Sequence, residues 1–317
     1  MQFIPRNDSP APRGRPTEPS SDQTGPGNSA ARRGDALLPG TRLDEYEVER
    51  VIATSGFGLV YLATDRAFER RVALKEYLPD TLAVRAPDGV QVMLRAGSHA
   101  EAFERGQRAF VDEARLLARL DHPSLLHVLR YWEGNGTVYR AMPYYPGTPL
   151  TRLREAMGTP PDEATLRALL EGLLEPLSML HAAGCIHREI APANILLLPD
   201  DRPVLLDWGA ARRAIVGDQA RALMTLLAPS FAPLELTAPT PQRPIGPWTD
   251  LYALAAVVRY CISGQLPPPA ALRTMPADEP LGRMIARQKL VNPELHYSAS
   301  FIAAMDAALA PRAEDRP

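Results

Sequence analysis

The sequence is poor in cysteine and in net charge. Cys185 and Cys261 are the only cysteines among 317 residues, so no disulfide framework is predicted and a reducing, cytosolic compartment is expected. Both cysteines have apolar neighbours, which is typical of small buried hydrophobic residues. The formal net charge of −2 lacks the basic excess of nucleic-acid-binding domains, so we expect no nucleic-acid partner.

Long hydrophobic runs are also missing. No run approaches the ~18 apolar residues that a membrane-spanning helix needs. The polar residues after Ile4-Pro5 leave no hydrophobic region for a signal peptide. We therefore expect a cytoplasmic protein without a membrane segment, whose 45% hydrophobic content is ample for a buried core.

Proline, glycine and serine are concentrated at the N-terminus. Residues 1–42 hold almost no large apolar side chain after Ile4, and such a segment cannot bury enough surface to offset its ordering entropy. We predict a disordered tail. A solvated leader is favoured here over a ligand for a proline-binding module.

From Tyr46 onwards, strand-like runs give way to helical periodicity. The predicted strands cover residues 46–63 (two strands around Thr54-Ser55-Gly56), 71–77, 128–132 and 137–142 (around an Asn135-Gly136 turn), 195–198 and 204–206. The predicted helices cover residues 103–120, 161–184, 250–263, 281–289 and 298–309. The fold class is therefore α+β, a small antiparallel sheet with one helix followed by a mainly helical part.

Several motifs stand in an order that resembles the serine/threonine protein kinases, in particular bacterial members of the eukaryotic type. Val72-Ala73-Leu74-Lys75 matches the V-A-I-K strand, and the resemblance implies that Lys75 holds the α- and β-phosphates of ATP. Glu113, on the following helix, would be its ion-pair partner, although the gap between them is long for the family. The run His187-Arg188-Glu189-Ile190-Ala191-Pro192-Ala193-Asn194 aligns with the catalytic loop and Asp207-Trp208-Gly209 with D-F-G. Asn194 and Asp207 are then the implied Mg²⁺ ligands.

The same resemblance implies an adenine site. In the glycine-rich loop only Gly58 stands, while Ala53 and Ser55 replace the first two glycines, so we expect weaker or altered nucleotide affinity. Met142 would be the gatekeeper, and the Pro143 carbonyl and the Tyr145 N–H would contact adenine. The apolar sandwich around the ring would consist of Val60 and Ala73 above and Leu196 below.

The implied architecture is the bilobal protein-kinase fold over residues 46–317. Its N-lobe would span residues 46–142, its hinge 143–146 and its C-lobe 147–317. Ala232-Pro233-Leu234-Glu235 approximates A-P-E, with Arg316 as the implied partner of Glu235 and Asp250 as the implied brace of the catalytic loop.

Two departures fall on the chemistry itself. Glu189 stands where the family has its catalytic aspartate, and Ala191 replaces a lysine that faces the transferring phosphate. A displaced carboxylate and a lost cation can together lower the rate by roughly 10³–10⁵. These changes are pseudokinase-like, and they favour a signalling domain that binds ATP and Mg²⁺ and a protein partner. The alternatives are a slow Ser/Thr kinase with Glu189 as base and protein substrates, or a small-molecule phosphotransferase of related fold.

The segment between Asp207 and Glu235 offers two hydroxyl groups for phosphorylation, Thr225 and Ser230. Arg188 is present to pair with such a phosphate. Thr225 is the preferred candidate. A loop that is never modified is at least as well supported.

Overall fold

The N-terminal lobe is built on a six-stranded antiparallel sheet with strand order β1-β2-β3-β4-β8-β7. Its strands are β1 Arg42–Leu43, β2 Tyr46–Ser55, β3 Gly58–Asp65, β4 Arg70–Tyr77, β7 Arg130–Gly134 and β8 Thr137–Pro143. The structure, a computed structural model, describes residues 34–206, 230–237, 240, 242–274, 279–290 and 292–317. The predicted strands of this lobe are confirmed to within a few residues at their ends. Asn135 and Gly136 have φ angles of 51° and 74°, as a two-residue type I′ hairpin turn requires.

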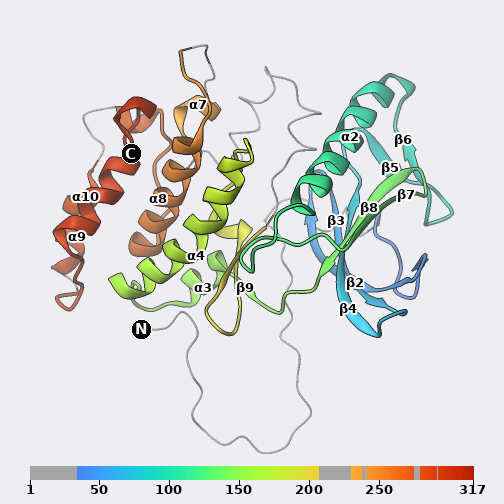
Figure 1. Ribbon diagram of the computed structural model, residues 1–317, viewed down its shortest axis with the longest axis horizontal. Coiled ribbons are helices and arrows are strands. Elements are labelled where there is room, and N and C mark those ends of the chain that lie inside the picture. The colour runs from blue at the N-terminus through green and yellow to red at the C-terminus, as the bar shows by residue number, and fades with distance from the viewer. Residues whose placement is uncertain (1–33, 207–229, 238–239, 241, 275–278, 291) are drawn as a thin grey trace, which may run out of the picture.

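A single long helix, α2 (Ala100–Leu117), lies beside this sheet (Figure 1). Its buried residues follow helical spacing, because every third or fourth side chain returns to the same face. They are Phe103, Gly106, Phe110, Val111, Glu113, Ala114 and Leu117. The helix therefore brings Glu113 to the sheet together with its apolar neighbours.

The long gap between Lys75 and Glu113 contains an inserted hairpin. Its strands β5 (Ala83–Arg85) and β6 (Val92–Leu94) pair only with one another, and a short 3-10 helix, η1 (Gly97–His99), leads into α2. We did not predict this hairpin from the sequence.

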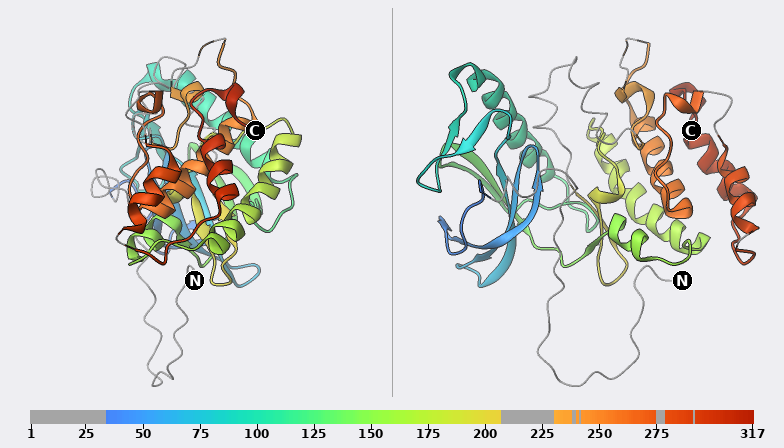
Figure 2. Two further views of the ribbon diagram at one scale, coloured as in Figure 1. Left: turned by 90° about the vertical axis from the view of Figure 1, so that its left-hand side faces the viewer. Right: turned by 180° about the vertical axis from the view of Figure 1, so that it is seen from behind.

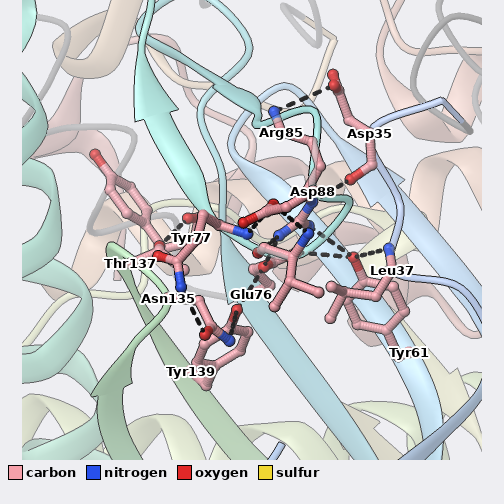
Figure 3. A network of polar contacts seen from close by, with 12 residues as sticks. Asp35, Leu37, Tyr61, Glu76, Tyr77, Arg85, Asp88, Asn135, Thr137 and Tyr139 are labelled. Carbon is pink, nitrogen blue, oxygen red and sulfur yellow. Dashed lines mark hydrogen bonds and ion pairs between the residues drawn. The ribbon is translucent and has the colours of Figure 1, made fainter. Parts of the chain in front are cut away.

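A buried polar network joins the hairpin to the sheet (Figure 3). Glu76, fully buried, accepts hydrogen bonds from the hydroxyls of Tyr61 (2.7 Å) and Tyr139 (2.8 Å) and forms an ion pair with Arg85 of β5. The Arg85 Nε also donates to the Asp35 carbonyl at 2.9 Å. Because side chains alternate along a strand, Glu76 points away from the face that holds Lys75. The network therefore anchors β4, the strand that carries Lys75, on the face of the sheet opposite to Lys75.

Some residues assigned to the tail by the sequence analysis are part of the packed N-terminal lobe. Leu37 is 2% exposed and belongs to the apolar core of the sheet, and its N–H donates to the Tyr61 hydroxyl at 3.2 Å. The predicted tail of residues 1–42 is therefore too long at its C-terminal end. Residues 1–33 lie outside the described residues, so the rest of that prediction remains a prediction.

The C-terminal lobe is mainly helical and lies beside the sheet (Figure 2). Its helices are α3 Leu150–Ala156, α4 Glu163–Ala182, α7 Leu234–Thr237, α8 Pro247–Ser263, α9 Leu281–Lys289 and α10 Ala299–Ala308. A small sheet of β11 (Pro203–Leu205), β10 (Ile195–Leu197) and β9 (Thr148–Pro149) adjoins them, with 3-10 turns η2 Pro192–Asn194, η4 Leu272–Thr274 and η5 Ala313–Asp315. Four of these helices (α4, α8, α9 and α10) were predicted, whereas α3, α7 and β9 were not. Among the helices that the structure describes, none is long and apolar enough to cross a membrane.

The two cysteines differ in burial. Cys261 lies fully buried in α8, and this burial raises the pKa of its thiol to about 12. The predicted buried position is therefore confirmed for Cys261. It is wrong for Cys185, which is only half-buried, because Cys185 lies in the turn after α4 and not in a helix interior.

Candidate functional site

A cleft of about 510 Å³ separates the sheet from the helical lobe. It is lined by side chains of β2, β3, β4 and β8 on one side and of α3, the segment 193–196 and Leu206 on the other. The predicted site residues that it collects are Ala53, Val60, Ala73, Lys75, Met142, Pro143, Tyr145, Asn194 and Leu196. Residues far apart in the sequence thus meet in one concave site.

Part of the cleft lining is apolar. Val60 and Ala73 lie on the sheet side, and Leu196 and Leu206 lie on the helical side. Met142, only 4% exposed, lines the cleft next to them. Apolar walls favour an aromatic ring as ligand, because most of the surface of such a ring can leave water without loss of hydrogen bonds.

The connection between the lobes runs directly after β8. Pro143 ends that strand, and Tyr145 is partly buried against the core, which raises the pKa of its phenol. At Gly147 a β-carbon would lie 2.6 Å from the Leu197 carbonyl oxygen. Only glycine lets the chain pass this close to β10.

The loop above the cleft is a tight hairpin between β2 and β3. Ser55 and Gly58 are cross-strand partners, and the Ser55 hydroxyl accepts from the Phe57 N–H and donates to the Gly58 carbonyl, both at 3.3 Å. A β-carbon at Gly58 would lie 2.0 Å from the Glu76 carbonyl oxygen. The glycine is therefore required by packing against β4, and its predicted role near phosphates remains a prediction.

Two cations and one carboxylate meet beside the cleft. Lys75 and Arg140 are cross-strand partners on β4 and β8, and both line the cleft. Arg140 Nη1 forms an ion pair with Glu113 Oε1 at 2.8 Å, and the two side chains are 0% and 3% exposed. Arg140 is thus one ion-pair partner of Glu113. The predicted Lys75–Glu113 pair remains a prediction.

The loop that carries Glu189 is held from below by Asp250. The Asp250 carboxylate accepts from the backbone N–H groups of His187 and Arg188 at 2.8 Å each and lies 2.8 Å from His181 Nε2. Arg188 has a φ angle of +67°, an uncommon conformation for a side-chain-bearing residue that these contacts stabilise. The predicted brace is confirmed.

Asn194 connects this loop to the cleft. Its side-chain amide donates to the backbone carbonyl of Glu189 at 2.7 Å, and its backbone carbonyl accepts from the Leu206 N–H at 2.8 Å. Asn194 lines the cleft, and the chain continues from Leu206 directly to Asp207. Asp207 lies outside the described residues. The Mg²⁺ site predicted at Asn194 and Asp207 therefore remains a prediction.

Below the cleft, Glu235 and Arg316 form the ion pair expected from the sequence. Arg316 Nη1 lies 2.6 Å from Glu235 Oε1, and the two side chains are 0% and 2% exposed. Ser230 is 8% exposed, so its hydroxyl is shielded in this arrangement. Thr225 lies outside the described residues.

Several cleft residues were not identified from the sequence. They are Ile52, Thr54, Leu126, Arg140, Tyr144, Gly147, Pro149, Thr151, Arg152, Glu155, Ala193 and Leu206. Arg140 had a detectable signal, because it is the one charged residue in a strand that is otherwise apolar or weakly polar and stands two positions before Met142 on the same face. Thr151, Arg152 and Glu155 had none, since α3 itself was missed.

Comparison with known proteins agrees with this geometry. Residues 46–317 match the protein kinase domain family. The chain is 30% identical over 234 residues to the serine/threonine-protein kinase PknA of Mycobacterium tuberculosis, a match that covers 70% of this chain and 47% of PknA. It is 26% identical over 249 residues to PknD of Chlamydia abortus, which covers 71% of this chain and 25% of PknD.

Solved structures give the same result. The structure described as the PpkA-294 apo form is 40% identical with a TM-score of 0.77, and the match covers 89% of this chain and 96% of that one. The Mycobacterium tuberculosis PknI kinase domain is 26% identical with a TM-score of 0.61, covering 89% and 94%. The chain spans about half or less of the length of PknA and PknD. It belongs to the protein kinase family and is homologous to the bacterial serine/threonine kinases of eukaryotic type.

Proposed function

We propose that this domain binds ATP with Mg²⁺ in the cleft and acts as a signalling module whose phosphotransfer is weak or absent. The observation that carries the proposal is the grouping of Lys75, Asn194 and apolar walls in one cleft. Lys75 supplies a cation for phosphates and Asn194 an oxygen ligand for Mg²⁺, with Asp207 as the second ligand. Adenine then occupies the apolar part, against the Pro143 carbonyl and the Tyr145 N–H. Ala53, Ser55, Gly58 and Glu113 belong to this binding site as supporting residues.

The reduced chemistry follows from the catalytic loop. Glu189 has one methylene more than the family's aspartate, and Ala191 supplies no positive charge to the transferring phosphate. The binding parts of the site are thus present while the proton-handling parts are altered. A protein partner or substrate and a cytoplasmic location complete the proposal.

Binding is tested by thermal unfolding with and without ATP–Mg²⁺. A ligand at ~100 times its Kd should add about 2.7 kcal/mol to the free energy of unfolding. Lys75→Ala and Asp207→Ala should lose most of this gain, whereas Lys289→Ala, the chain's other lysine and one that lies on α9, should keep it. No shift in the native chain at millimolar ATP–Mg²⁺ would rule out the proposal.

Having only two lysines allows a second, direct test. An acyl-phosphate derivative of ATP should acylate Lys75 and leave Lys289 unmodified, with free ATP as competitor and peptide mass spectrometry as the readout. Equal labelling of both lysines that ATP does not reduce would contradict nucleotide binding in the cleft.

The second candidate is a slow Ser/Thr kinase in which Glu189 is the base. It is favoured by the intact support of its loop, namely the Asp250 brace and the Asn194–Glu189 hydrogen bond. Autophosphorylation of the native chain that Glu189→Ala abolishes would select this candidate. A silent native chain that gains at least ~10²-fold in transfer to a basic protein from Glu189→Asp with Ala191→Lys would select the first.

A further inference from the structure

The chain that follows β4 is hydrogen-bonded to the tip of the loop between β2 and β3. The Leu78 N–H donates to the Phe57 carbonyl and the Asp80 N–H donates to the Gly56 carbonyl, at 3.1 Å each. Both bonds lie beyond the last paired residues of β3 and β4, so they extend the contact between these strands into the loop. The tip of the loop is therefore held by the backbone of a neighbouring segment as well as by its own turn.

Residues 78–95, which form the insert, are themselves fixed in place. The Arg95 Nε donates to the Asp80 carbonyl at 2.7 Å, and the Arg95 N–H donates to the Leu82 carbonyl at 2.9 Å. The two ends of the insert are thus joined through Arg95. Between them, Arg85 forms its buried ion pair with β4 (Figure 3). A segment that is closed at its ends and anchored in its middle is a suitable support for the loop.

The loop leads directly into the cleft lining. Ala53 and Thr54, immediately before the tip, line the cleft, whereas no residue of the insert does. A loop that is free in solution loses conformational entropy when it orders over a ligand, and a loop that is already held avoids this loss. The hydrogen bonds of Gly56 and Phe57 therefore favour a loop that is ordered before any ligand binds.

We propose that the insert is a positioning element for the phosphate part of the nucleotide site, and that Arg95 is its positioning residue, acting through the Asp80 carbonyl. The proposal rests on nucleotide binding in the cleft. It adds that the affinity for ligands with phosphates depends on a segment that does not line the cleft. Adenosine has no phosphates for the loop to cover, so its binding should be nearly independent of the insert.

The test measures the dissociation constants of ATP–Mg²⁺ and of adenosine for the full chain by calorimetry. Arg95 is exposed, so its substitution should leave the fold intact. In Arg95→Met the affinity for ATP–Mg²⁺ should fall by about three- to tenfold, the effect of one net hydrogen bond, and that for adenosine by less than about twofold. Equal affinity for ATP–Mg²⁺ in the native chain and in Arg95→Met, or an equal loss for both ligands, would overturn the proposal.

Two further variants separate the hydrogen bond from the charge. Glutamine carries its amide nitrogen as many bonds from the backbone as arginine carries Nε, so Arg95→Gln removes the charge and keeps a donor. It should bind ATP–Mg²⁺ within about twofold of the native chain. Arg42→Met removes another exposed arginine of the same lobe, one that pairs with Glu47 away from the loop, and should change neither affinity. If either variant binds ATP–Mg²⁺ as weakly as Arg95→Met does, the charge is the cause and the positioning role is wrong.

Hydrogen exchange without ligand, followed by NMR, separates this proposal from the one it rests on. The amides of Leu78 and Asp80 should exchange slowly in the native chain and in Arg95→Gln, and faster in Arg95→Met. Fast exchange of both amides in a native chain that binds ATP–Mg²⁺ would overturn the inference alone. A native chain that binds no ATP–Mg²⁺ would overturn the proposed function and, with it, the role toward phosphates, even where both amides are protected.

Discussion

At the scale of single residues, Gly58 in the hairpin between β2 and β3 has a structural role that differs from the one its sequence motif suggests. The sequence singles out Gly58 by its place in a phosphate-binding pattern, whereas the structure shows that a β-carbon at this position would meet the Glu76 carbonyl of β4. Packing between strands is thus a sufficient reason for the glycine. It would hold whether or not a nucleotide is bound.

We therefore expect Gly58→Ala to destabilise the protein itself. A β-carbon 2.0 Å from a backbone oxygen forces the strands apart, which should lower the free energy of unfolding by about 1–3 kcal/mol. Chemical denaturation without nucleotide measures the change. Gly158→Ala is the matched control, because nothing lies within 4 Å of a β-carbon there. Equal stability of the two variants would show that the loop does not pack on β4 in solution.

Glu189 and Ala191 differ from Gly58 in that their importance is readable from the sequence alone. The type of side chain, a longer carboxylate and a missing cation, is itself the chemical change. The structure adds that the loop is held in place by Asp250. The departures from the family at Glu189 and Ala191 are therefore changes of side chain, while the Asp250 carboxylate supports the backbone of the loop, as the family resemblance leads one to expect.

At the scale of elements, a buried ion pair connects the β5–β6 hairpin to the sheet. The side chains of Arg85 and Glu76 are 3% and 0% exposed, and two tyrosine hydroxyls also donate hydrogen bonds to the Glu76 carboxylate (Figure 3). Removal of one partner leaves a charge buried without compensation. The hairpin thus contributes to the stability of the strand that carries Lys75.

Arg85→Met should lower the free energy of unfolding by about 3–5 kcal/mol, the usual effect of breaking a buried pair. Arg105→Met is the control, since Arg105 pairs with Glu101 on the exposed face of α2 and should contribute only ~0.3–0.5 kcal/mol. Urea denaturation of both variants gives the comparison. A loss below about 1 kcal/mol in Arg85→Met would contradict the network.

At the scale of the whole molecule, buried tyrosines occur in both lobes. Burial raises the pKa of Tyr61, Tyr77 and Tyr139 in the sheet lobe and of Tyr297 in the helical lobe. For Tyr61 and Tyr139 the nearby Glu76 carboxylate raises it further. The folded state therefore retains phenol protons that the unfolded chain releases near pH 10.

The protein should consequently lose stability steeply in alkali. Below pH ~10 both states keep these protons, and above it each such tyrosine should lower the free energy of unfolding by roughly 1.4 kcal/mol per pH unit, until the folded-state pKa is reached. Melting temperature from pH 8 to 11, recorded with phenolate absorbance, tests this. The phenolate signal of these residues should appear together with unfolding, and Tyr139→Phe should make the decline shallower. Full ionisation before unfolding would refute the expectation.

Local pattern was sufficient for most of the long elements. The helical spacing in α2, the turn residues Asn135-Gly136 and the strand motif ending at Lys75 are properties of neighbouring residues, so they can be read from the sequence. The order of the motifs likewise led to the kinase fold. The short elements β5, β6, β9, α3 and α7 were not predicted, because two to seven residues are too few to show a period.

The fold class, the kinase resemblance and the altered catalytic loop can all be predicted without a structure, because each depends on residue types in a fixed order. That Glu113 pairs with Arg140 is visible only in three dimensions, because the register of β4 against β8 places Arg140 beside Lys75 and the packing of α2 brings Glu113 to Arg140. The contacts of Leu37 with Tyr61 and of Arg85 with Glu76 are likewise visible only in the folded structure. Contacts between residues far apart in the chain arise from packing geometry, and no local pattern encodes them.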